Sequence, residues 1–578
     1  MHDNNNNKSK FNPNIQLVKS IQLKSVEKDK EIIFTRADKG QTVIAIDKTE
    51  YKSKTFDFLQ SNIYEQVPTD PTNKYQMQIK DSLSDSLLFN EFERNNLILM
   101  NPQSPKLYSF LKLHKEHIPI RPVVSFITSP SVKLSRKLIP IILHYTNFSA
   151  ENSIKNSLDL INKIKEVKLS PNTKLLSFDV KNLFPSVPPQ EVLQLIHNML
   201  NHNNTDQRIK EEILRLCKVC IDQNFFGFDA KFFTAKGGLI MGNPLSPLLA
   251  EIFMDNLERK IRKQPFFKNI IFWYRYVDDI FCAIRGTNRQ IDKFLEFLNK
   301  LHPNIEFTVE FENNSSINFL DLTISRDNNG LVFDIFHKPT HTDTTIHNTS
   351  LHPYSQKLAS FYTYIHRLIN LPLSKENFEK ELNLIKEIAV NKGYDPSLTD
   401  SILHKKQYKK CISSIYPTFP TTNKRFQVLT FIGEPSLDIT KLLSKFDLNI
   451  AFKTCNNLSN FIKNNKSKLR DDQKSGVYKL ECGSCDKVYI GQTGRTFRRR
   501  MYEHFRSYLN QDGESNYANH LIDYNHVFNN KYKILHQENK GMILNLLETL
   551  EINRLKNCDV LLNNQLDLKN SPLLNLKS

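Results

Sequence analysis

The sequence predicts an α+β protein with several domains. The chain has 578 residues, which is longer than a typical single domain and allows a large core. Strand-like apolar runs alternate with amphipathic helical stretches along most of it. Lys and Arg number 79 against 61 Asp and Glu, and the resulting formal charge of +18 favours a polyanionic partner.

Neither a signal peptide nor a long apolar segment is visible, and eight cysteines are too few for a disulfide scaffold. We therefore expect a soluble protein in a reducing intracellular compartment, without a membrane partner. The chain begins with the low-complexity stretch MHDNNNNKSKFN, and we predict a disordered tail over residues 1–30.

The chain is organised around residues 269–285, NIIFWYRYVDDIFCAIR. Apolar and aromatic residues on both sides of Asp278 and Asp279 predict two strands and a tight turn with both carboxylates at its tip. Adjacent carboxylates repel each other, so a cation must neutralise them or one keeps its proton. Oxygen ligands of this kind suit Mg²⁺. A bare pair of aspartates is more often a polar turn, so the metal interpretation needs a third carboxylate elsewhere.

Near the N-terminus, strand-like runs at 32–35 and 42–46 flank the sequence RADKG. One interpretation is an ordinary hairpin with a polar tip. The other places Arg36 and Lys39 against a phosphate, because a glycine turn also lets backbone amides approach the anion.

A basic segment follows a helical region that runs to about Met100. Residues 105–122, PKLYSFLKLHKEHIPIRP, place basic groups among aromatics and prolines. Lys112 and Arg121 are candidates for contact with nucleic acid or a triphosphate. A solvated basic loop is the alternative.

The third carboxylate is predicted at Asp179, where the short buried strand LLSFD ends. An acid at the C-terminal end of a strand is a common catalytic arrangement. If Asp179 has this role, Phe184 would lie below a sugar ring and exclude a 2′-hydroxyl, which selects deoxynucleotides. A lone aromatic residue is otherwise more often part of the core.

Residues 235–254, AKGGLIMGNPLSPLLAEIFM, predict a glycine-rich loop that enters a helix at about Ser246. Such a loop lets backbone and small side chains lie flat against a base pair, and we assign Gly242 to this contact. An ordinary loop–helix junction is the alternative. Upstream, Cys217 and Cys220 have the spacing of half a zinc site, but no second ligand pair is near, so we interpret them as ordinary helix cysteines.

Further elements are predicted downstream. We expect helices over 291–301, 354–369 and 375–390, paired strands over 317–324 and 331–336 joined by an Asn-Asn-Gly turn, and short strands over 426–432 and 448–452.

The motifs around Asp179 (FDVKNLF), the loop GGLIMGNPLSP and the hairpin YRYVDD resemble, in this order, the palm of a reverse transcriptase. RADKG, LKLHKEHIPIRPVVS, INFLDL and HKPTHTDTTIHNTSLHP are similar to the Penelope-like retroelements, whose polymerase is akin to telomerase. The resemblance covers roughly residues 31–400 and implies a right-hand polymerase. The expected parts are an N-terminal extension at 31–100, fingers and palm at 101–340, a thumb-like helical region at 341–400 and a linker at 401–474.

The resemblance also implies RNA-templated DNA synthesis from deoxynucleoside triphosphates. Asp179, Asp278 and Asp279 would hold two Mg²⁺ ions, one activating the primer 3′-hydroxyl and the other steadying the triphosphate. One departure from the pattern is that no lysine clearly serves as proton donor to the pyrophosphate, and Lys338 is only a candidate.

The C-terminal part, residues 475–578, predicts two strands at 477–480 and 487–490 followed by an arginine-rich helix. The paired sequences Gly-Val-Tyr at 476–478 and Tyr-Ile-Gly at 489–491 resemble those of GIY-YIG endonucleases, so we expect a small α/β nuclease domain. A basic helix alone would more often be a solvated face.

Hydrolysis by such a site needs a tyrosine or histidine near the attacking water, an arginine for the phosphorane charge and a carboxylate to hold one Mg²⁺. The candidates are Tyr478, Tyr489, Arg500, His504 and, as the metal ligand, Glu548. Arg499 and Glu551 are rivals, because the register can differ by one residue or one turn.

A zinc site is predicted in the same domain. Cys482 and Cys485 lie between the two strands, and His520 and His526 follow in NHLIDYNH. Two cysteines and two histidines complete a tetrahedral structural Zn²⁺ site. Penelope-like elements with this nuclease carry a similar set. A reduced turn without metal is the alternative.

We therefore expect a retroelement protein that copies RNA into DNA and nicks target DNA to supply the primer. It would be made in the cytoplasm and act in the nucleus, with an RNA template and target DNA as partners; homo-oligomerisation is left open. One alternative is a telomerase-like polymerase that primes on chromosome ends with an inactive nuclease. Another is a nucleic-acid-binding protein with decayed active sites, which the presence of all three aspartates disfavours.

Overall fold

The computed structural model describes most of the chain. The described residues are 31–40, 42–60, 63–113, 115–327, 330–340, 342–415, 426–446, 448–454, 470–529, 531–555 and 559–563. The predicted tail at 1–30 and the two asparagines of the predicted turn, 328–329, lie outside them. Within the described part of the chain, no helix is both long and apolar enough to cross a membrane.

A four-stranded antiparallel sheet lies at the centre of the chain, in the order β11-β6-β10-β9. Its strands are β6 (Thr173–Val180), β9 (Ile270–Tyr276), β10 (Asp279–Arg285) and β11 (Phe307–Phe311). The predicted apolar hairpin is confirmed, since β9 and β10 pair directly on either side of Val277 and Asp278. The expected strand before Asp179 is confirmed as β6.

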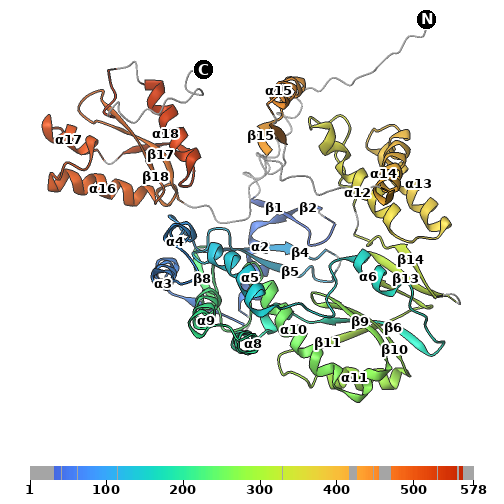
Figure 1. The fold of residues 1–578 in the computed structure, drawn as a ribbon. Helices are drawn as coiled ribbons and strands as arrows, with labels where there is room; N and C mark the ends of the chain where they lie inside the picture. The colour runs from blue at the N-terminus through green and yellow to red at the C-terminus, as the bar shows by residue number, and fades with distance from the viewer. Residues whose placement is uncertain are drawn as a thin grey trace, which may run out of the picture.

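Alternation along β6 separates the two faces of this sheet. Leu176, Phe178 and Val180 pack on a layer of helices, in the largest core of the protein. That layer comprises α5 (Val132–Thr146), α8 (Pro189–His202), α9 (Gln207–Asp222), α10 (Ser246–Arg262) and α11 (Asn288–Leu298), seen around the sheet in Figure 1. Leu175 faces the other way, into a second core. The aspartates of β6 and β10 belong to the face without this helical layer.

The second core is built on a three-stranded sheet, β12 (Ser316–Phe319), β13 (Leu322–Asp327) and β14 (Gly330–Ile335), with helix α6 (Ser157–Ile164). The prediction of one strand over 317–324 is wrong. Leu320 has a left-handed backbone (φ +55°), so the chain turns there and β12 pairs antiparallel with β13.

A five-stranded sheet has the order β3-β8-β7-β4-β5. Three of its strands come before β6 in the chain, and β7 and β8 come between β6 and β9. The strands are β3 (Tyr64–Val67), β4 (Lys106–Leu111), β5 (Ile120–Ser125), β7 (Phe225–Phe228) and β8 (Lys231–Ala235). The segment interpreted as a basic, proline-containing stretch thus contains two paired strands. Pro122 is tolerated because β5 is an edge strand, where a missing N–H leaves no ladder hydrogen bond unmade.

The remaining elements before residue 345 belong to none of these three sheets. They are β1 (Ile32–Arg36), β2 (Val43–Asp47), α2 (Lys48–Leu59), α3 (Thr72–Ser84), α4 (Glu91–Leu97), α7 (Leu183–Ser186) and the 3-10 helix η1 (Pro265–Asn269). The predicted hairpin around RADKG is confirmed as the antiparallel pair β1–β2.

A bundle of three helices follows: α12 (Tyr354–Asn370), α13 (Lys375–Asn391) and α14 (Ser397–Ile415). They share one apolar core that includes Phe361, Ile385 and Ile402, and they stand together in Figure 1. Helix α14 continues past residue 400, the boundary expected between helical region and linker. Beyond it, β15 (Phe426–Thr430), α15 (Glu434–Ser444) and β16 (Asn449–Lys453) form a small unit with two parallel strands.

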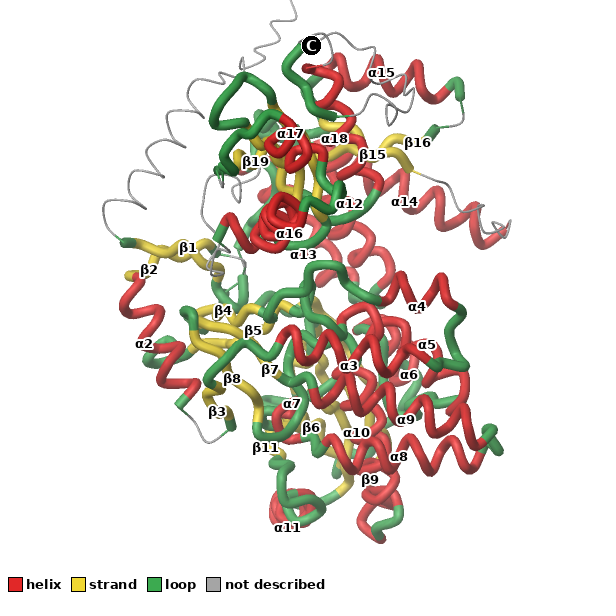
Figure 2. Tube along the Cα trace, turned by 90° about the vertical axis from the view of Figure 1, so that its left-hand side faces the viewer, coloured by secondary structure: helices red, strands yellow, loops and turns green. Residues whose placement is uncertain are grey.

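The C-terminal unit has a three-stranded antiparallel sheet in the order β18-β17-β19. Its elements are the 3-10 helix η3 (Asp471–Gln473), β17 (Gly476–Glu481), β18 (Val488–Thr493), α16 (Phe497–Asn510), α17 (Asn516–Asp523), β19 (Tyr532–Gln537) and α18 (Met542–Leu555). Figure 2 shows α16, α17 and α18 around these strands. The two strands and the basic helix predicted here are confirmed.

Candidate active sites and zinc centre

The three predicted carboxylates meet at one end of the central sheet. Asp279 is the first residue of β10 and pairs directly with Asp179 on β6. Asp278 lies at the hairpin tip, and its carbonyl accepts a hydrogen bond from the Val180 amide (3.2 Å). The site therefore depends on strand register, because slipping β10 by one residue would turn Asp279 to the opposite face.

Burial and mutual repulsion change the protonation of this group. Burial, followed by the charges of Asp278 and Asp179, raises the pKa of Asp279 to about 6. Burial and Asp179 also raise the pKa of Asp278. A site of partly buried, mutually repelling carboxylate oxygens stabilises a bound dication, so the donor set fits Mg²⁺. When bound, such ions activate a hydroxyl for attack and neutralise charge on phosphate oxygens.

Two lysines lie close enough to these carboxylates to affect them. The charges of Lys338 and Lys39 both oppose the rise in the pKa of Asp279. Lys39, Lys338, Asp279 and Tyr276 line one cavity of about 850 Å³. Burial and Lys338 lower the pKa of Lys39. The RADKG hairpin thus brings a lysine close to these carboxylates, whereas Arg36 is exposed and does not line this cavity.

The hairpin loop is held on two sides. The Asp38 amide donates to the Leu111 carbonyl (2.9 Å), and its carboxylate, which is 3% exposed, pairs with Arg121 (3.0 Å). On the other side Gly40 touches Thr340: a Cβ there would lie 2.1 Å from the Thr340 carbonyl oxygen, and φ is +80°. Only glycine fits this contact without movement.

Lys112 lies close enough to Arg121 for the two positive charges to repel each other. Burial and the positive charge of Arg121 lower the pKa of Lys112, which indicates that basic groups cluster where Lys112 follows β4 and Arg121 lies on β5. A phosphate would relieve this repulsion, so both residues remain candidates for such a contact.

Phe184 and Gly242 have partners within the protein. Phe184 packs partly buried against the main core, and its carbonyl accepts from the Leu239 amide (2.8 Å). Gly242 has φ +122°, and a Cβ there would lie 1.9 Å from the Val124 carbonyl oxygen. Close packing of this loop on β5 is thus one reason for glycine at 242. Their contacts with sugar and template stay predictions.

In the C-terminal unit the predicted residues form a polar network. The Tyr478 hydroxyl lies 2.7 Å from His504 Nε2 and accepts from Arg500 Nε (3.1 Å). His504 Nδ1 lies 2.7 Å from Ser515 Oγ. Burial, followed by the charge of Arg500, lowers the pKa of His504 to about 3, so its imidazole is neutral at pH 7. The neutral ring accepts a hydrogen bond from the Tyr478 hydroxyl at Nε2 and donates one from Nδ1 to the Ser515 hydroxyl.

Tyr489 and Glu548 lie at the edge of this network. The Tyr489 ring is 5.5 Å from that of His504. Glu548 accepts from Gln492 Nε2 (2.7 Å), and its charge raises the pKa of Tyr478 after burial and Tyr489. An acid, an arginine and a tyrosine–histidine pair therefore lie in one polar group, and the carboxylate of Glu548 offers the kind of oxygen ligand that suits Mg²⁺.

The rival residues have other partners. Glu551 forms an ion pair with Arg554 (2.6 Å) and lies within hydrogen-bond distance of His536 Nε2 (2.6 Å). Arg499 is two-thirds exposed and lies 3.6 Å from Glu503. These contacts favour Arg500 and Glu548.

Glu503 and Ser515 are residues that sequence reasoning missed. Glu503 pairs with Arg495 (2.7 Å) and Arg500 (3.2 Å), and these three residues line a cavity of about 430 Å³ at the N-terminal half of α16. The spacing of three residues between Arg500 and Glu503 on a helix was the available signal. No local pattern connects Ser515 with His504.

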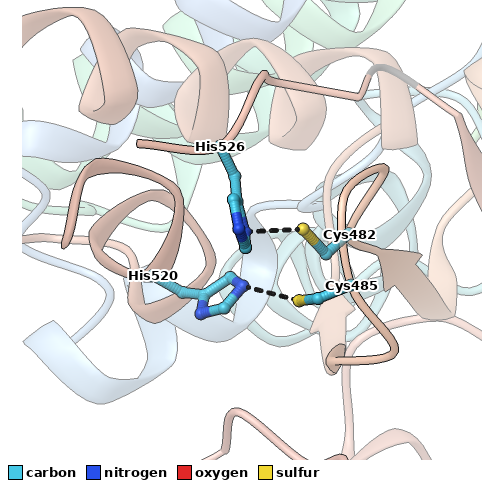
Figure 3. A group of neighbouring side chains, drawn as sticks. All are labelled: Cys482, Cys485, His520 and His526. Atoms are coloured by element: carbon cyan, nitrogen blue, oxygen red, sulfur yellow. Dashed lines mark hydrogen bonds between the residues drawn. The ribbon is translucent and has the colours of Figure 1, made fainter. Parts of the chain in front are cut away.

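The four predicted zinc ligands converge. Cys482, Cys485, His520 and His526 place their ligand atoms within 4.8 Å of one another. Figure 3 shows His526 Nδ1 facing Cys482 Sγ and His520 Nε2 facing Cys485 Sγ, each at 3.3 Å. This Cys₂His₂ set fits a tetrahedral zinc ion. By contrast, Cys217 and Cys220 are fully buried in α9, where burial raises the pKa of Cys220 to about 12, and their interpretation as helix cysteines is confirmed.

Comparison with known families identifies two segments. Residues 113–312 match the family model for reverse transcriptase (RNA-dependent DNA polymerase). Residues 344–404, which include α12 and α13, match the family model for the animal helix-turn-helix domain. No curated protein matches the chain.

Solved structures of polymerases are similar in fold. The telomerase of Candida albicans, in complex with a fragment of telomeric RNA, is 12% identical over 66% of this chain and 68% of its own, with a TM-score of 0.44. The apo telomerase of Candida tropicalis is 11% identical over 66% and 69%, with a TM-score of 0.42. The Sicinivirus 3Dpol RNA-dependent RNA polymerase is 12% identical over 70% and 86%, with a TM-score of 0.37.

The family match covers all three aspartates, and the central sheet brings them together. The chain therefore contains a reverse transcriptase region, an RNA-dependent DNA polymerase, at residues 113–312.

Proposed function

We propose that this protein copies RNA into DNA by two-metal catalysis and nicks target DNA with its C-terminal unit to provide the primer. The observation that carries the polymerase part is the register of the central sheet, which sets Asp179 opposite Asp279 beside Asp278. The observation that carries the nuclease part is the hydrogen-bonded group of Tyr478, Arg500 and His504.

In the polymerase, Asp179, Asp278 and Asp279 would hold two Mg²⁺ ions, which would supply activation of the primer 3′-hydroxyl and charge neutralisation on the triphosphate. The chain itself contributes positive charge around the phosphates, from Lys39 and Lys338 in the cavity beside Asp279. Phe184 selects deoxynucleotides from below the sugar. Arg121 and Lys112 contact nucleic acid or triphosphate from the neighbouring sheet.

In the nuclease, Glu548 holds one Mg²⁺ ion. The neutral His504 accepts a hydrogen bond from the Tyr478 hydroxyl and keeps that hydroxyl oriented, so that its oxygen can accept a hydrogen bond from the attacking water. Arg500 donates to Tyr478 and offers its remaining N–H groups to the phosphorane charge. The zinc ion bound by Cys482, Cys485, His520 and His526 is structural.

The partners of this activity are an RNA template, target DNA and deoxynucleoside triphosphates. The helix-turn-helix match suggests that α12–α14 bind DNA. Because the target is chromosomal, the protein acts in the nucleus.

A nicking assay tests the nuclease and the coupling. Supercoiled plasmid, Mg²⁺, an RNA template and dNTPs are incubated with the wild type, Glu548→Gln, Asp278→Asn and a control, Glu551→Gln. We expect Glu548→Gln to lose nicking by roughly a hundred-fold or more while still extending a supplied primer. Asp278→Asn should nick normally without adding DNA at the nick. Glu551→Gln, which sits in a separate ion pair, should keep nicking.

Two results would contradict the proposal. Wild-type nicking by Glu548→Gln would exclude the assigned nuclease site. Extension of supplied primers without any nicking by the wild type would instead indicate a polymerase that uses existing DNA ends.

A further inference from the structure

Arg275 is a fully buried cation within the hairpin that carries Asp278 and Asp279. It lies on β9, three residues before Asp278, and its side chain is 0% exposed. Alternation along β9 puts Arg275 on the helix side of the central sheet with Trp273, away from the cavity that Asp279 lines. It therefore reaches neither metal nor substrate directly.

Two acids of α10 hold the guanidinium. Nε donates to Glu258 (2.8 Å), which is itself 1% exposed, and Nη1 donates to Glu251 (2.9 Å). Glu258 also accepts from Trp273 Nε1 (3.1 Å). The fork geometry of arginine thus ties β9 to the helix that follows the glycine-rich loop.

The same Nη1 reaches the turn between the aspartate-bearing strands. It donates to the carbonyl of Val277 (3.1 Å). Val277 has φ +58°, a left-handed conformation that a β-branched residue adopts only when its surroundings enforce it. Its own side chain is 40% exposed, so burial of that side chain contributes little to holding the turn.

Neighbouring backbone contacts complete the support. The Arg275 amide donates to the Asn152 carbonyl (2.9 Å), and its carbonyl accepts from the Ile154 amide (2.9 Å). The next carbonyl of the turn, that of Asp278, is held by Val180. Two successive peptide groups at the tip are therefore fixed, one by a side chain from behind the sheet and one by β6.

We infer that Arg275 is a positioning residue for DNA synthesis: through its bond to the Val277 carbonyl it fixes the strained turn that presents Asp278 and Asp279. This inference rests on the proposed role of those two aspartates. It predicts that chemistry slows when the bond is removed, even where the fold and substrate binding persist.

The test must separate positioning from folding, because removing one partner of a buried ion pair leaves an unpaired charge. Two variants avoid this. Arg275→Lys keeps the positive charge, but the single ammonium of lysine cannot donate to both acids and the Val277 carbonyl as the guanidinium does. Arg275→Met combined with Glu258→Gln removes the two fully buried charges and keeps an acceptor for Trp273. Glu251 also loses its partner, but its side chain is 23% exposed and can be solvated. The matched control is Arg326→Met with Glu312→Gln, a partly buried pair (2.8 Å) that does not touch the hairpin.

Primer extension on an RNA template, dNTP titration and thermal unfolding are measured for each protein. We expect both Arg275 proteins to unfold near the wild-type temperature, and kcat to fall roughly ten- to hundred-fold. The KM for dNTP and the affinity for primer–template should change little. The control pair should keep wild-type kcat.

A folded double variant with wild-type kcat would overturn the inference. If the double variant does not fold, a folded Arg275→Lys protein with wild-type kcat would overturn it. An equal loss of kcat in the control pair would also overturn it. Asp278→Asn in the same assay separates a failure of the aspartate assignment from a failure of the positioning role of Arg275. If that variant extends primers, the aspartate assignment fails, whereas an inactive Asp278→Asn beside an active Arg275 variant removes only the positioning role.

Discussion

At the scale of single residues, Asp279 combines two opposing demands. It must be ionised to bind a cation, yet burial and two neighbouring carboxylates raise its pKa to about 6. Because the raised pKa means that the fold favours the protonated form, the metal-free protein loses stability as pH rises from about 4 to about 6. A bound dication reverses this preference.

The first prediction concerns pH and magnesium. Lowering the pH through about 6 should raise the Mg²⁺ concentration needed for half-maximal primer extension, because protons compete for Asp279. Without Mg²⁺, the wild type should gain thermal stability relative to Asp279→Asn as the pH falls from about 7 to about 5. A magnesium requirement that does not change between about pH 5.5 and about pH 8 would contradict this assignment.

At the scale of elements, the β1–β2 hairpin reaches the catalytic end of the central sheet. Its tip contacts Leu111 on one side and Thr340 on the other, and this places Lys39 beside Asp279. The hairpin was predictable from its two apolar runs and its glycine. Its position was not, because residues 40 and 340 are far apart in the chain and no periodicity relates them.

The second prediction tests this contact. Gly40→Ala should lower kcat/KM for extension by roughly tenfold, because the new Cβ would lie 2.1 Å from the Thr340 carbonyl oxygen and displace Lys39. The control is Gly330→Ala, which also has a positive φ (+137°) but has no atom within 4 Å of its Cβ. Equal losses in both variants would mean that backbone strain alone, and not the contact, is responsible.

At the same scale, the Cys₂His₂ cluster joins the β17–β18 loop of the C-terminal unit to α17 and the turn after it. The third prediction is that the wild type carries about one zinc ion per chain and that Cys485→Ser does not retain it. This variant should unfold its C-terminal unit at a lower temperature. Cys411→Ser, at an exposed cysteine of α14, is the control. Retention of zinc by Cys485→Ser would exclude this ligand set.

Prediction from sequence succeeded where a pattern is local. Neighbouring residues in the sequence predicted the hairpin of β9 and β10, the acid Asp179 near the end of β6, and the two cysteines and two histidines of the Cys₂His₂ set. Strands β4 and β7 were missed because their pairing joins segments distant in the chain, Lys106 with Gly227, and β4 lies in a basic, proline-containing stretch. Arg275 and Glu503 were missed for a related reason: their roles depend on partners that only the folded chain brings together.

At the scale of the whole molecule, the reverse transcriptase region and the proposed nuclease both require that nucleic acid be held on the protein. The formal charge of +18 supports this, and α14 carries exposed lysines at 405 and 409, just beyond the helix-turn-helix match. Cations on an exposed helix bind phosphate without reading sequence.

The fourth prediction is that Lys405→Ala with Lys409→Ala weakens binding to duplex DNA of any sequence. The slope of log affinity against log salt should become shallower by about 0.9 for each phosphate that these lysines neutralise in the wild type. Lys210→Ala with Lys218→Ala, on α9, is the matched control for net charge. An unchanged slope in the α14 variant would place the DNA elsewhere.

The most direct test of the central claim is primer extension on an RNA template with Mg²⁺ and dNTPs, comparing the wild type with Asp278→Ala. The account predicts DNA synthesis by the wild type and its loss in a folded Asp278→Ala protein. Equal extension by both proteins, or none by a folded wild type on RNA or DNA templates, would contradict it.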